Sequence, residues 1–483
     1  MEGSKLLTGT PVAAMTLEVV ILAAGQGTRM RSQLPKVLHP LAGVALLGHV
    51  LETARELKAA RIHVVIGHGA EQVRSELDAD DVRWVIQEEQ LGTGHAVLQA
   101  MPGVNDDATV LVLYGDVPLL QAQTLAELVA RAPALLTAEV DSADGYGRVL
   151  RDEHDQLQGV VEHKDATDAQ RSINEINSGV LAYPAALLKN YLPRVGNANV
   201  QGEYYLPDVL AMAVGEGHSV AALRAADANE ILGINDRVQL AEAESLLQHR
   251  RARALMLGGV TLADPARIDI RGELHCAEDV SIDVNCVFEG RVVLGRGVSI
   301  GANCVLRDCE IAAGSTVHPF CHIDGARLGD ACHVGPFARL RPGTELAAGA
   351  RIGNFVETKK AVIGEGSKVN HLSYIGDATL GAGVNVGAGT ITCNYDGINK
   401  HPTILEDDVF VGSNSTLVAP LTVGKGGFIA AGSTVTRDVQ DNALGVARGK
   451  QRNIDNWQTP RQRTAGAEHT TKDNTQNRDA GES

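Results

Sequence analysis

The chain has 483 residues, a net charge of -16 at pH 7 and only 3% aromatic residues. This length predicts two or three domains, each with its own core. The negative charge argues against nonspecific binding of nucleic acid, so an anionic substrate must be met by locally placed Arg and Lys side chains.

The ends of the chain and its cysteines predict a cytoplasmic protein. Residues 1–16 lack the basic and apolar regions of a signal peptide and are expected to be an extension, while residues 458–483 are polar and expected to be a disordered tail. No apolar run reaches the roughly 20 residues of a membrane span. All seven cysteines lie between Cys276 and Cys393 without a C-x-x-C pair, which favours free thiols over a zinc or redox site.

Residues 17–234 alternate apolar strands with helical stretches. Strands are expected at Val19–Leu22, Ile62–Ile66, Val82–Ile86, Val110–Leu113 and Val220–Leu223. Helical spacing covers Ala42–Ala60 and Gln121–Arg131. This order predicts an α/β domain with a mostly parallel sheet, which binds ligands at the carboxyl ends of its strands. Residues 235–258 follow as a linker helix, which Asn235 is expected to cap.

A glycine-rich loop follows the first strand. From Ala23 to Gly27 it has almost no side chains, so its backbone N–H groups can approach a phosphate, and Arg29 and Lys36 supply positive charge. It is neither a dinucleotide fingerprint, because Met30 stands where a glycine is required, nor a Walker A loop. The loop therefore predicts a nucleotide site of another kind, with an ordinary glycine turn as the alternative.

Asp116 is the best-placed metal ligand in this half. It follows the apolar run at 110–113, at the same edge of the sheet as the glycine loop. Mg²⁺ usually takes one or two protein oxygens together with phosphate oxygens, so an Asp beside a phosphate loop fits it. A purely structural Asp before a turn proline is the alternative.

From Ile268 to Gln440 the pattern changes to one aliphatic residue at every sixth position, often followed by Gly. The repeat includes Ile282, Phe288, Leu294, Ile300 and Leu306, and after a break it resumes at Leu405, Val411, Leu417 and Val423. This period predicts a parallel β-helix over residues 259–457, with about 18 residues in each triangular coil and roughly nine or ten coils.

The repeat also assigns cysteines and histidines to structural positions. Four cysteines lie four places after a repeat aliphatic and are expected to fill the core: Cys286, Cys304, Cys321 and Cys332. His318, His322 and His333 are expected to be exposed. The polar run after Val386 is expected to loop out, and His371 lies shortly before it.

The glycine loop resembles that of the sugar-nucleotide pyrophosphorylases. Their signature, L-x-x-G-x-G-T-R-[ML] followed by P-K, stands complete from Leu22 to Met30 and at Pro35-Lys36. Further motifs (QLGTGHA, LYGDVP, GYGR, VEHKDA, INSG and GINDR) are similar to those of the bifunctional bacterial enzymes that make UDP-N-acetylglucosamine. The resemblance covers about residues 17–457.

This resemblance implies a Rossmann-like nucleotidyltransferase domain that transfers uridylyl from UTP to N-acetylglucosamine 1-phosphate with Mg²⁺. The residues implied at its site are Leu22, Ala23, Ala24, Gly25, Lys36, Gln87, Gly92, Thr93, Tyr114, Gly115, Asp116, Gly147, Glu162, Asn177 and Asn235. Gln87 and the Gly92-Thr93 pair would read uracil, and Asp116 and Asn235 would hold the metal. Arg29 would steady the pyrophosphate and Lys36 the α-phosphate or the sugar phosphate.

The resemblance also implies acetylation of glucosamine 1-phosphate by acetyl-CoA on a left-handed β-helix. His371 would act as the base, and the substrate would be held by Arg341, Lys359, Tyr374 and Asn385, with Asn394 also near the sugar. Acetyl-CoA would contact Ala388, Asn394, Tyr395, Ser413, Ala431 and Arg448. Members of the family are trimers with the acetyl-transfer site at subunit boundaries, and they supply peptidoglycan and lipopolysaccharide synthesis.

Two alternatives remain at this point. One is a single-activity sugar-nucleotide pyrophosphorylase whose β-helix serves regulation or assembly. Together, His371, Tyr374 and Asn394 argue against it. The other is a non-enzymatic scaffold, which would be expected to have lost Arg29, Lys36 or Asp116, all of which are present.

Overall fold

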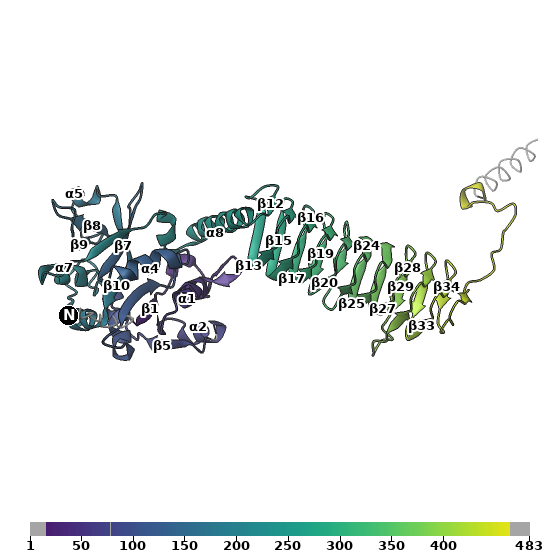
Figure 1. Cartoon of the computed structure of the whole chain (residues 1–483), viewed down its shortest axis with the longest axis horizontal. Helices are drawn as coiled ribbons and strands as arrows, with labels where there is room; N and C mark the ends of the chain where they lie inside the picture. The colour runs from purple at the N-terminus through teal and green to yellow at the C-terminus, as the bar shows by residue number, and fades with distance from the viewer. Residues whose placement is uncertain (1–15, 78, 464–483) are drawn as a thin grey trace, which may run out of the picture.

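The computed structural model describes residues 16–77 and 79–463, and in it an α/β domain is joined by a long helix to a rod of stacked coils (Figure 1). The expected extension, apart from Thr16, and the expected tail beyond residue 463 lie outside the described residues. No helix in the described part of the chain is long and apolar enough to span a membrane.

The α/β domain is built on a mostly parallel sheet in the order β11-β7-β10-β6-β1-β4-β5. Its strands are β1 (Leu17–Ala23), β4 (Arg61–Ile66), β5 (Val82–Ile86), β6 (Thr109–Tyr114), β7 (Ala134–Glu139), β10 (Glu175–Pro184) and β11 (Ala221–Arg224), with the hairpin β8 (Arg148–Arg151) and β9 (Leu157–Val161) beside β10. Only β10 runs antiparallel to its neighbours β6 and β7. Each of the five predicted strands is present within one or two residues of its expected bounds.

Helices cover both faces of this sheet. They are α1 (Leu46–Glu56), α2 (Ala70–Leu77), α3 (Thr93–Ala100), α4 (Ala122–Ala130), α5 (Asp168–Arg171), α6 (Ala185–Tyr191) and α7 (Asp208–Gly215). Val19 and Ile21 of β1 pack into the core shared with α1 and α4, whereas Val20 and Leu22 pack into the core shared with α3, α6 and α7. Apart from Glu18, which is buried beside His63, the strand is apolar because both of its faces are buried.

Two predicted helix starts are wrong. The first helix begins at Leu46 rather than Ala42, because the hairpin of β2 (Pro40–Leu41) and β3 (Val44–Ala45) occupies the preceding residues. The linker helix α8 (Arg237–Leu257) is capped by Asp236, whose carboxylate accepts from the backbone N–H groups of Val238 and Gln239 at 2.9 Å. Its neighbour Asn235 is therefore free to turn toward the sheet.

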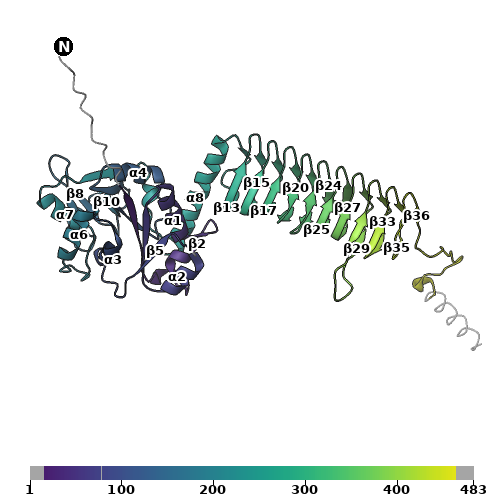
Figure 2. The ribbon, with the colours of Figure 1, turned by 60° about the horizontal axis from the view of Figure 1, so that its bottom comes forward.

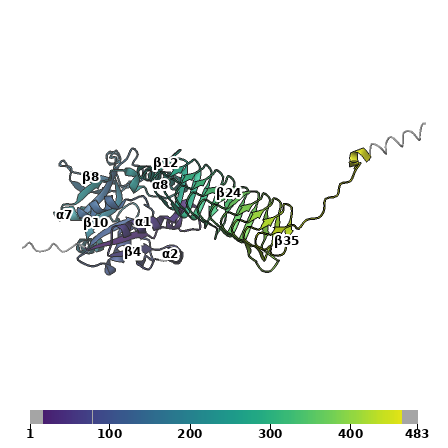
Figure 3. The ribbon, with the colours of Figure 1, turned by 45° about the vertical axis from the view of Figure 1, so that its right-hand side comes forward.

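The second half is a left-handed parallel β-helix whose coils stack along one axis (Figure 3). One column contains β12 (Thr261–Leu262), β14 (Ser281–Ile282), β16 (Ser299–Ile300), β18 (Thr316–Val317), β21 (His333–Val334), β24 (Arg351–Asn354), β26 (Lys368–His371), β28 (Asn385–Val386), β31 (Phe410–Val411), β34 (Phe428–Ile429) and β36 (Leu444–Gly445). This column has 11 strands, because β12 and β36 extend it beyond the expected repeat region.

The other faces form a second sheet. Its strands are β13 (Ile268–Cys276), β15 (Cys286–Leu294), β17 (Val305–Ile311), β19 (His322–Asp324), β20 (Arg327–Leu328), β22 (Arg339–Leu340), β23 (Glu345–Leu346), β25 (Glu357–Ile363), β27 (Tyr374–Leu380), β29 (Ile391–Cys393), β30 (Thr403–Leu405), β32 (Thr416–Val418), β33 (Leu421–Val423) and β35 (Thr434–Val435). Across the polar run after Val386, neighbouring coils are offset by 25 residues. Most other neighbouring coils are offset by 17 or 18 residues, as in the side-chain pairs Asn354–His371 and Asn285–Asn303. This offset agrees with the predicted coil length.

The predicted repeat aliphatics form one continuous buried core. Two threonines occupy core positions where the aliphatic pattern breaks: Thr358 and Thr392 are at most 1% exposed. The Thr358 hydroxyl forms a hydrogen bond with the Thr344 hydroxyl at 3.0 Å, and the Thr392 hydroxyl accepts one from the Gly376 N–H at 2.8 Å. In each case a hydrogen bond takes the place of apolar packing. The sequence pattern alone did not find them, because a polar residue interrupts an apolar period.

The cysteine prediction is confirmed, and the histidine prediction is partly wrong. All seven cysteines are free, and the four assigned to the core are buried. His318 and His333 are exposed and their rings stack, but His322 is only half-exposed and its Nε2 is buried without a hydrogen-bond partner among the described residues. The polar loop between β29 and β30 projects from the rod, as expected (Figure 2).

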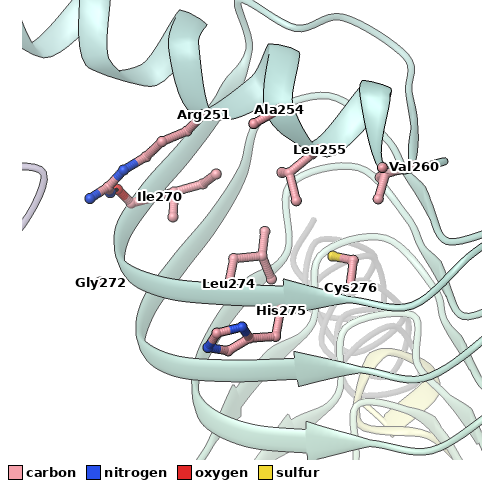
Figure 4. Close-up of a pocket in the computed structure, with 10 residues that line it drawn as sticks. Arg251, Ala254, Leu255, Val260, Ile270, Gly272, Leu274, His275 and Cys276 are labelled. Carbon is pink, nitrogen blue, oxygen red and sulfur yellow. Dashed lines mark hydrogen bonds between the residues drawn. The ribbon is translucent and has the colours of Figure 1, made fainter. Parts of the chain in front are cut away.

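An open pocket of about 420 Å³ lies at the junction between α8 and the first coil (Figure 4). Leu255, Ile270 and Leu274 give it an apolar lining, and Arg251 closes one side by donating to the Ile270 carbonyl at 2.7 Å. Beside it, the buried amide of Gln248 accepts from the Ile270 N–H and donates to the Ile270 carbonyl, both at 2.9 Å. Gln248 thus attaches the helix to the edge strand β13 as a neighbouring strand would.

We expect Gln248→Leu to lower the free energy of unfolding of the β-helix. The substitution leaves the buried Ile270 N–H without an acceptor, which costs about 1–3 kcal/mol. Urea unfolding followed by circular dichroism measures the change, with His249→Ala on the exposed side of the same helix as the matched control. Equal stability of the two variants would contradict the role given to Gln248.

Two candidate active sites

A cavity of about 230 Å³ opens at the carboxyl ends of the central strands. Strand β1 pairs with β4 on one side and with β6 on the other, so the loops that leave β1 and β6 diverge and leave a crevice. The predicted residues that line it are Leu22, Ala23, Ala24, Gly25, Lys36, Gln87, Gly92, Thr93, Tyr114 and Asp116. The structure therefore brings together residues that lie far apart in the sequence.

Lys36 lies between the two residues proposed as metal ligands. Its ammonium contacts the Asp116 carboxylate and donates to the Asn235 side-chain oxygen at 3.1 Å. A backbone hydrogen bond from the Ile234 N–H to the Asp116 carbonyl, at 2.9 Å, brings Asn235 beside Asp116. The two side-chain oxygens thus converge on one position that holds a positive charge.

This oxygen pair fits a small hard cation. A carboxylate and an amide oxygen are ligands that Mg²⁺ takes, and the phosphates of a nucleotide would complete its coordination. No group of three or more His, Cys, Asp or Glu side chains arranged for metal binding occurs in residues 16–77 and 79–463.

The opposite end of the cavity carries Gln87 and Gly92. Gln87 is 3% exposed, and its amide nitrogen donates to the Gly92 carbonyl at 3.3 Å. Gly92 has φ +113°, and a Cβ there would stand 2.7 Å from the Tyr204 carbonyl oxygen. Only glycine fits this turn, because both the backbone angle and the space exclude a side chain.

The predicted sugar residues lie beside the cavity around Tyr114. The Asn177 N–H donates to the Gly147 carbonyl at 2.9 Å, and a Cβ on Gly147 would meet the Glu162 carboxylate at 3.1 Å. Burial, followed by the nearby charges of Glu162 and Asp116, raises the pKa of Tyr114. The phenol is therefore neutral and able to donate a hydrogen bond.

Some predicted residues do not line the cavity, and some lining residues were not predicted. Arg29 is exposed in a short 3₁₀ turn (Thr28–Met30), and Gly115 packs against Ala23 and Val37. Unpredicted lining residues are Val37, Gln90, Ala96 and Glu203. Glu203 comes from the QGEYYLPD segment, for which no role was predicted.

The second candidate site lies on the rod at the corner between β26 and β27. His371 is exposed at the end of β26, and its Nδ1 lies 2.9 Å from the Asn354 side-chain oxygen one coil earlier. An oxygen acceptor at Nδ1 holds the proton there and leaves Nε2 as the basic nitrogen. Asn354 was not predicted, because only the coil offset places it beside His371.

Cationic side chains from neighbouring coils lie close together at this corner of the rod. Arg341 forms an ion pair with Glu357 at 2.9 Å, and the registers of β22, β25 and β27 place Arg341, Lys359 and Asp377 in neighbouring coils. The pKa of Lys359 is lowered, chiefly by the adjacent Lys400 side chain. Lys400 comes from the projecting loop and was not among the predicted residues.

The other predicted residues of this half form a ladder along successive coils. Asn394 contacts Asp377, and the Tyr374 ring lies against Gly376, where a Cβ would stand 2.4 Å from the hydroxyl. Further along the rod, hydrogen bonds join residues of successive coils. The Asn414 N–H donates to the Ala388 carbonyl, the Gly432 N–H donates to the Ser413 carbonyl, and the Arg448 guanidinium donates to the Ala431 carbonyl at 2.9 Å. Asn385 lies in β28, and Tyr395 lies in the projecting loop.

Comparison with known proteins agrees with both halves. Residues 19–180 match the model of the MobA-like NTP transferase domain. The chain is 59% identical over 449 residues to the bifunctional protein GlmU of Marinobacter nauticus, covering 92% of this chain and 99% of that protein. It belongs to the GlmU family. GlmU proteins of Stutzerimonas stutzeri and Alkalilimnicola ehrlichii are 56% and 58% identical over 450 residues, again 92% of this chain and 99% and 97% of theirs.

GlmU membership extends over the α/β domain, the linker helix and the β-helix together. Each alignment spans 449 or 450 residues, more than either half of the chain contains, so it includes parts of both halves. The two halves therefore belong to one family of bifunctional proteins rather than to a chance pairing of two domains.

Proposed function

We propose that this chain is a two-site enzyme that first acetylates glucosamine 1-phosphate and then joins the product to uridylyl from UTP. The observation that carries the proposal is the convergence of Lys36, Asp116 and Asn235 at the mouth of the cavity, on a chain that also presents His371 on the rod. We assign residues 17–234 to uridylyl transfer, residues 259–457 to acetyl transfer and residues 235–258 to the connection.

Uridylyl transfer needs no protein nucleophile. An oxygen of the sugar phosphate attacks the α-phosphorus of UTP, a P–O bond forms, and the bond to pyrophosphate breaks in line. The glycine loop at Ala24 and Gly25 holds phosphate through backbone N–H groups, and Lys36 and Arg29 neutralise negative charge. Arg29 makes no ion pair with any other described residue, so its guanidinium is available to the departing pyrophosphate.

Mg²⁺ is the metal we assign to Asp116 and Asn235. When bound, it would neutralise phosphate charge and orient the triphosphate for attack. Lys36 now holds the position between these oxygens, so we infer that its ammonium turns toward the phosphates when the metal site fills. The same lysine would then hold the sugar phosphate against the α-phosphorus.

Glu162 offers a test of the sugar end of this site. Burial raises its pKa, and nearby Asp165, Asp208 and Glu203 raise it further, so its ionised form at neutral pH opposes folding. We expect Glu162→Gln to raise the melting temperature at pH 7 to 8 and to raise the KM for N-acetylglucosamine 1-phosphate. The gain in stability should vanish as the pH falls below about 4.3, the ordinary pKa of Glu, because the wild-type carboxyl then becomes protonated in both states. A lower melting temperature at pH 8 would contradict this account.

Acetyl transfer needs a base and positioned phosphate ligands. His371 Nε2 takes a proton from the amine of glucosamine 1-phosphate, the nitrogen attacks the thioester carbon, and the coenzyme leaves as a thiol. Arg341, Lys359 and Lys400 form a cationic group suited to the sugar phosphate. The lowered pKa of Lys359 reflects repulsion between these cations, which a bound phosphate would relieve.

A trimer in the cytoplasm completes the proposal. On one chain His371 is exposed, and an apolar ladder of Phe320, Phe337, Phe355 and Leu372 runs beside it with each side chain 46–60% exposed. Packing of a second and a third copy along the rod would bury this ladder and enclose the acetyl-transfer site. Sedimentation equilibrium tests the assembly, and a monomer at micromolar concentration would count against it.

Mass spectrometry tests the reaction sequence directly. The enzyme is supplied with glucosamine 1-phosphate, acetyl-CoA, UTP and Mg²⁺, and we expect UDP-N-acetylglucosamine, pyrophosphate and free coenzyme A. Omission of acetyl-CoA should stop product formation, and N-acetylglucosamine 1-phosphate should restore it. If only acetylated sugar phosphate forms, the uridylyl assignment is wrong, and if only added N-acetylglucosamine 1-phosphate is used, the β-helix is structural.

A further inference from the structure

The buried amide of Gln87 has a fixed orientation in the nucleotide cavity. Its nitrogen donates to the Gly92 carbonyl at 3.3 Å and lies 3.0 Å from Nδ1 of His95. The Gly92 carbonyl can only accept, so the atom facing it must be the amide nitrogen rather than the amide oxygen. Both amide protons are thereby used, one on Gly92 and one on His95.

This orientation also fixes the protonation of His95. Because the Gln87 nitrogen brings a proton to Nδ1, that ring nitrogen must be the acceptor and Nε2 must carry the ring proton. On the far side of the ring, Nε2 lies 3.1 Å from the amide nitrogen of Gln99, one helical turn further along α3. Because a protonated Nε2 needs an acceptor, we assign the Gln99 amide with its oxygen on this side. His95 thus links Gln99 to Gln87.

At Gln87 and Gly92, the groups left free are one acceptor and one donor. No described residue donates to the Gln87 oxygen, and the Gly92 N–H has no acceptor within the described ranges. A uracil ring presents a matching N3–H and carbonyl oxygen side by side. Cytosine presents the reverse pair, an unprotonated N3 and an amino group.

We propose that His95 is a positioning residue that selects UTP over CTP by holding the Gln87 amide with its oxygen toward the base. His95 does not line the cavity and acts only through Gln87. Without an acceptor at this point, the Gln87 amide would be free to turn its N–H toward N3 of cytosine. The proposal rests on the function proposed above, since it concerns the nucleotide site of uridylyl transfer.

The test compares kcat/KM for UTP and for CTP in the full-length enzyme with N-acetylglucosamine 1-phosphate and Mg²⁺. We expect His95→Phe, which keeps a ring of similar size but removes the acceptor, to reduce the UTP-to-CTP ratio about tenfold, the size of one net hydrogen bond. The KM for UTP should rise while kcat changes little, because base contacts are made equally in ground and transition states. His95→Asn, whose oxygen replaces Nδ1, should restore the ratio.

Control variants separate this role from a structural one. His154→Phe replaces an exposed histidine far along the chain and should leave the ratio unchanged. If His95→Phe does not fold, Gln99→Leu releases the ring proton and should also lower the ratio. An unchanged ratio in the folded variant, with equal loss for both nucleotides, overturns the proposal. A wild-type enzyme that does not use UTP overturns the proposed function instead.

Discussion

Asp116→Ala is expected to abolish uridylyl transfer and to leave acetyl transfer unchanged. The carboxylate is one of the two oxygens that converge beside the phosphate loop, and its loss leaves Asn235 as the only protein ligand proposed for the metal. Removal of a group that stabilises charge in a transition state costs about 100- to 1,000-fold in kcat. Pyrophosphate release measures the first reaction, and thiol release from acetyl-CoA measures the second.

The fold should survive this substitution. The backbone carbonyl of Asp116, rather than its side chain, accepts from the Ile234 N–H, so the link between β6 and the linker helix remains. Asp107→Ala, in an exposed loop of the same domain, is the matched control and should keep both activities. Loss of acetyl transfer along with uridylyl transfer would show that the two sites are not independent.

His371→Ala has the opposite expected outcome. A positioned general base contributes about 10²- to 10⁴-fold to the rate, so acetyl transfer should fall by that factor while uridylyl transfer from added N-acetylglucosamine 1-phosphate continues. Because the side chain is exposed and Asn354 is its one hydrogen-bond partner among the described residues, the substitution removes no core packing. The same two assays, run side by side, measure the outcome.

Two further variants sharpen this result. His333→Ala removes an exposed histidine from the same β-helix and should leave acetyl transfer intact. Asn354→Leu removes the acceptor at His371 Nδ1 and should lower kcat and shift the pH profile, because the ring loses the partner that fixes its proton. A pH profile identical to that of the wild type would refute the role of Asn354.

Patterns of hydrophobicity were sufficient to predict most of the fold. The apolar strands of the α/β domain and the six-residue repeat were recognised because burial on both faces, and burial at one position per hexad, impose regular spacing on the chain. The pattern did not predict buried polar residues whose side chains make hydrogen bonds inside the core, such as Thr358 and Thr392. It also failed at the cap of α8, where Asn235 and Asp236 have the same cap propensity and only the tertiary contact with Lys36 separates them.

By itself, the sequence determined the chemistry that the chain can offer: a glycine loop with Lys36, a carboxylate after an apolar strand and a histidine on a six-residue repeat. Tertiary structure alone decided which atoms meet. It brought Asn235 beside Asp116, Asn354 beside His371 and His95 beside Gln87. The reason is physical: hydrophobic periodicity is a local property that can be read along the chain, whereas a hydrogen bond between distant residues depends on strand order and coil offset, which only the packed fold fixes.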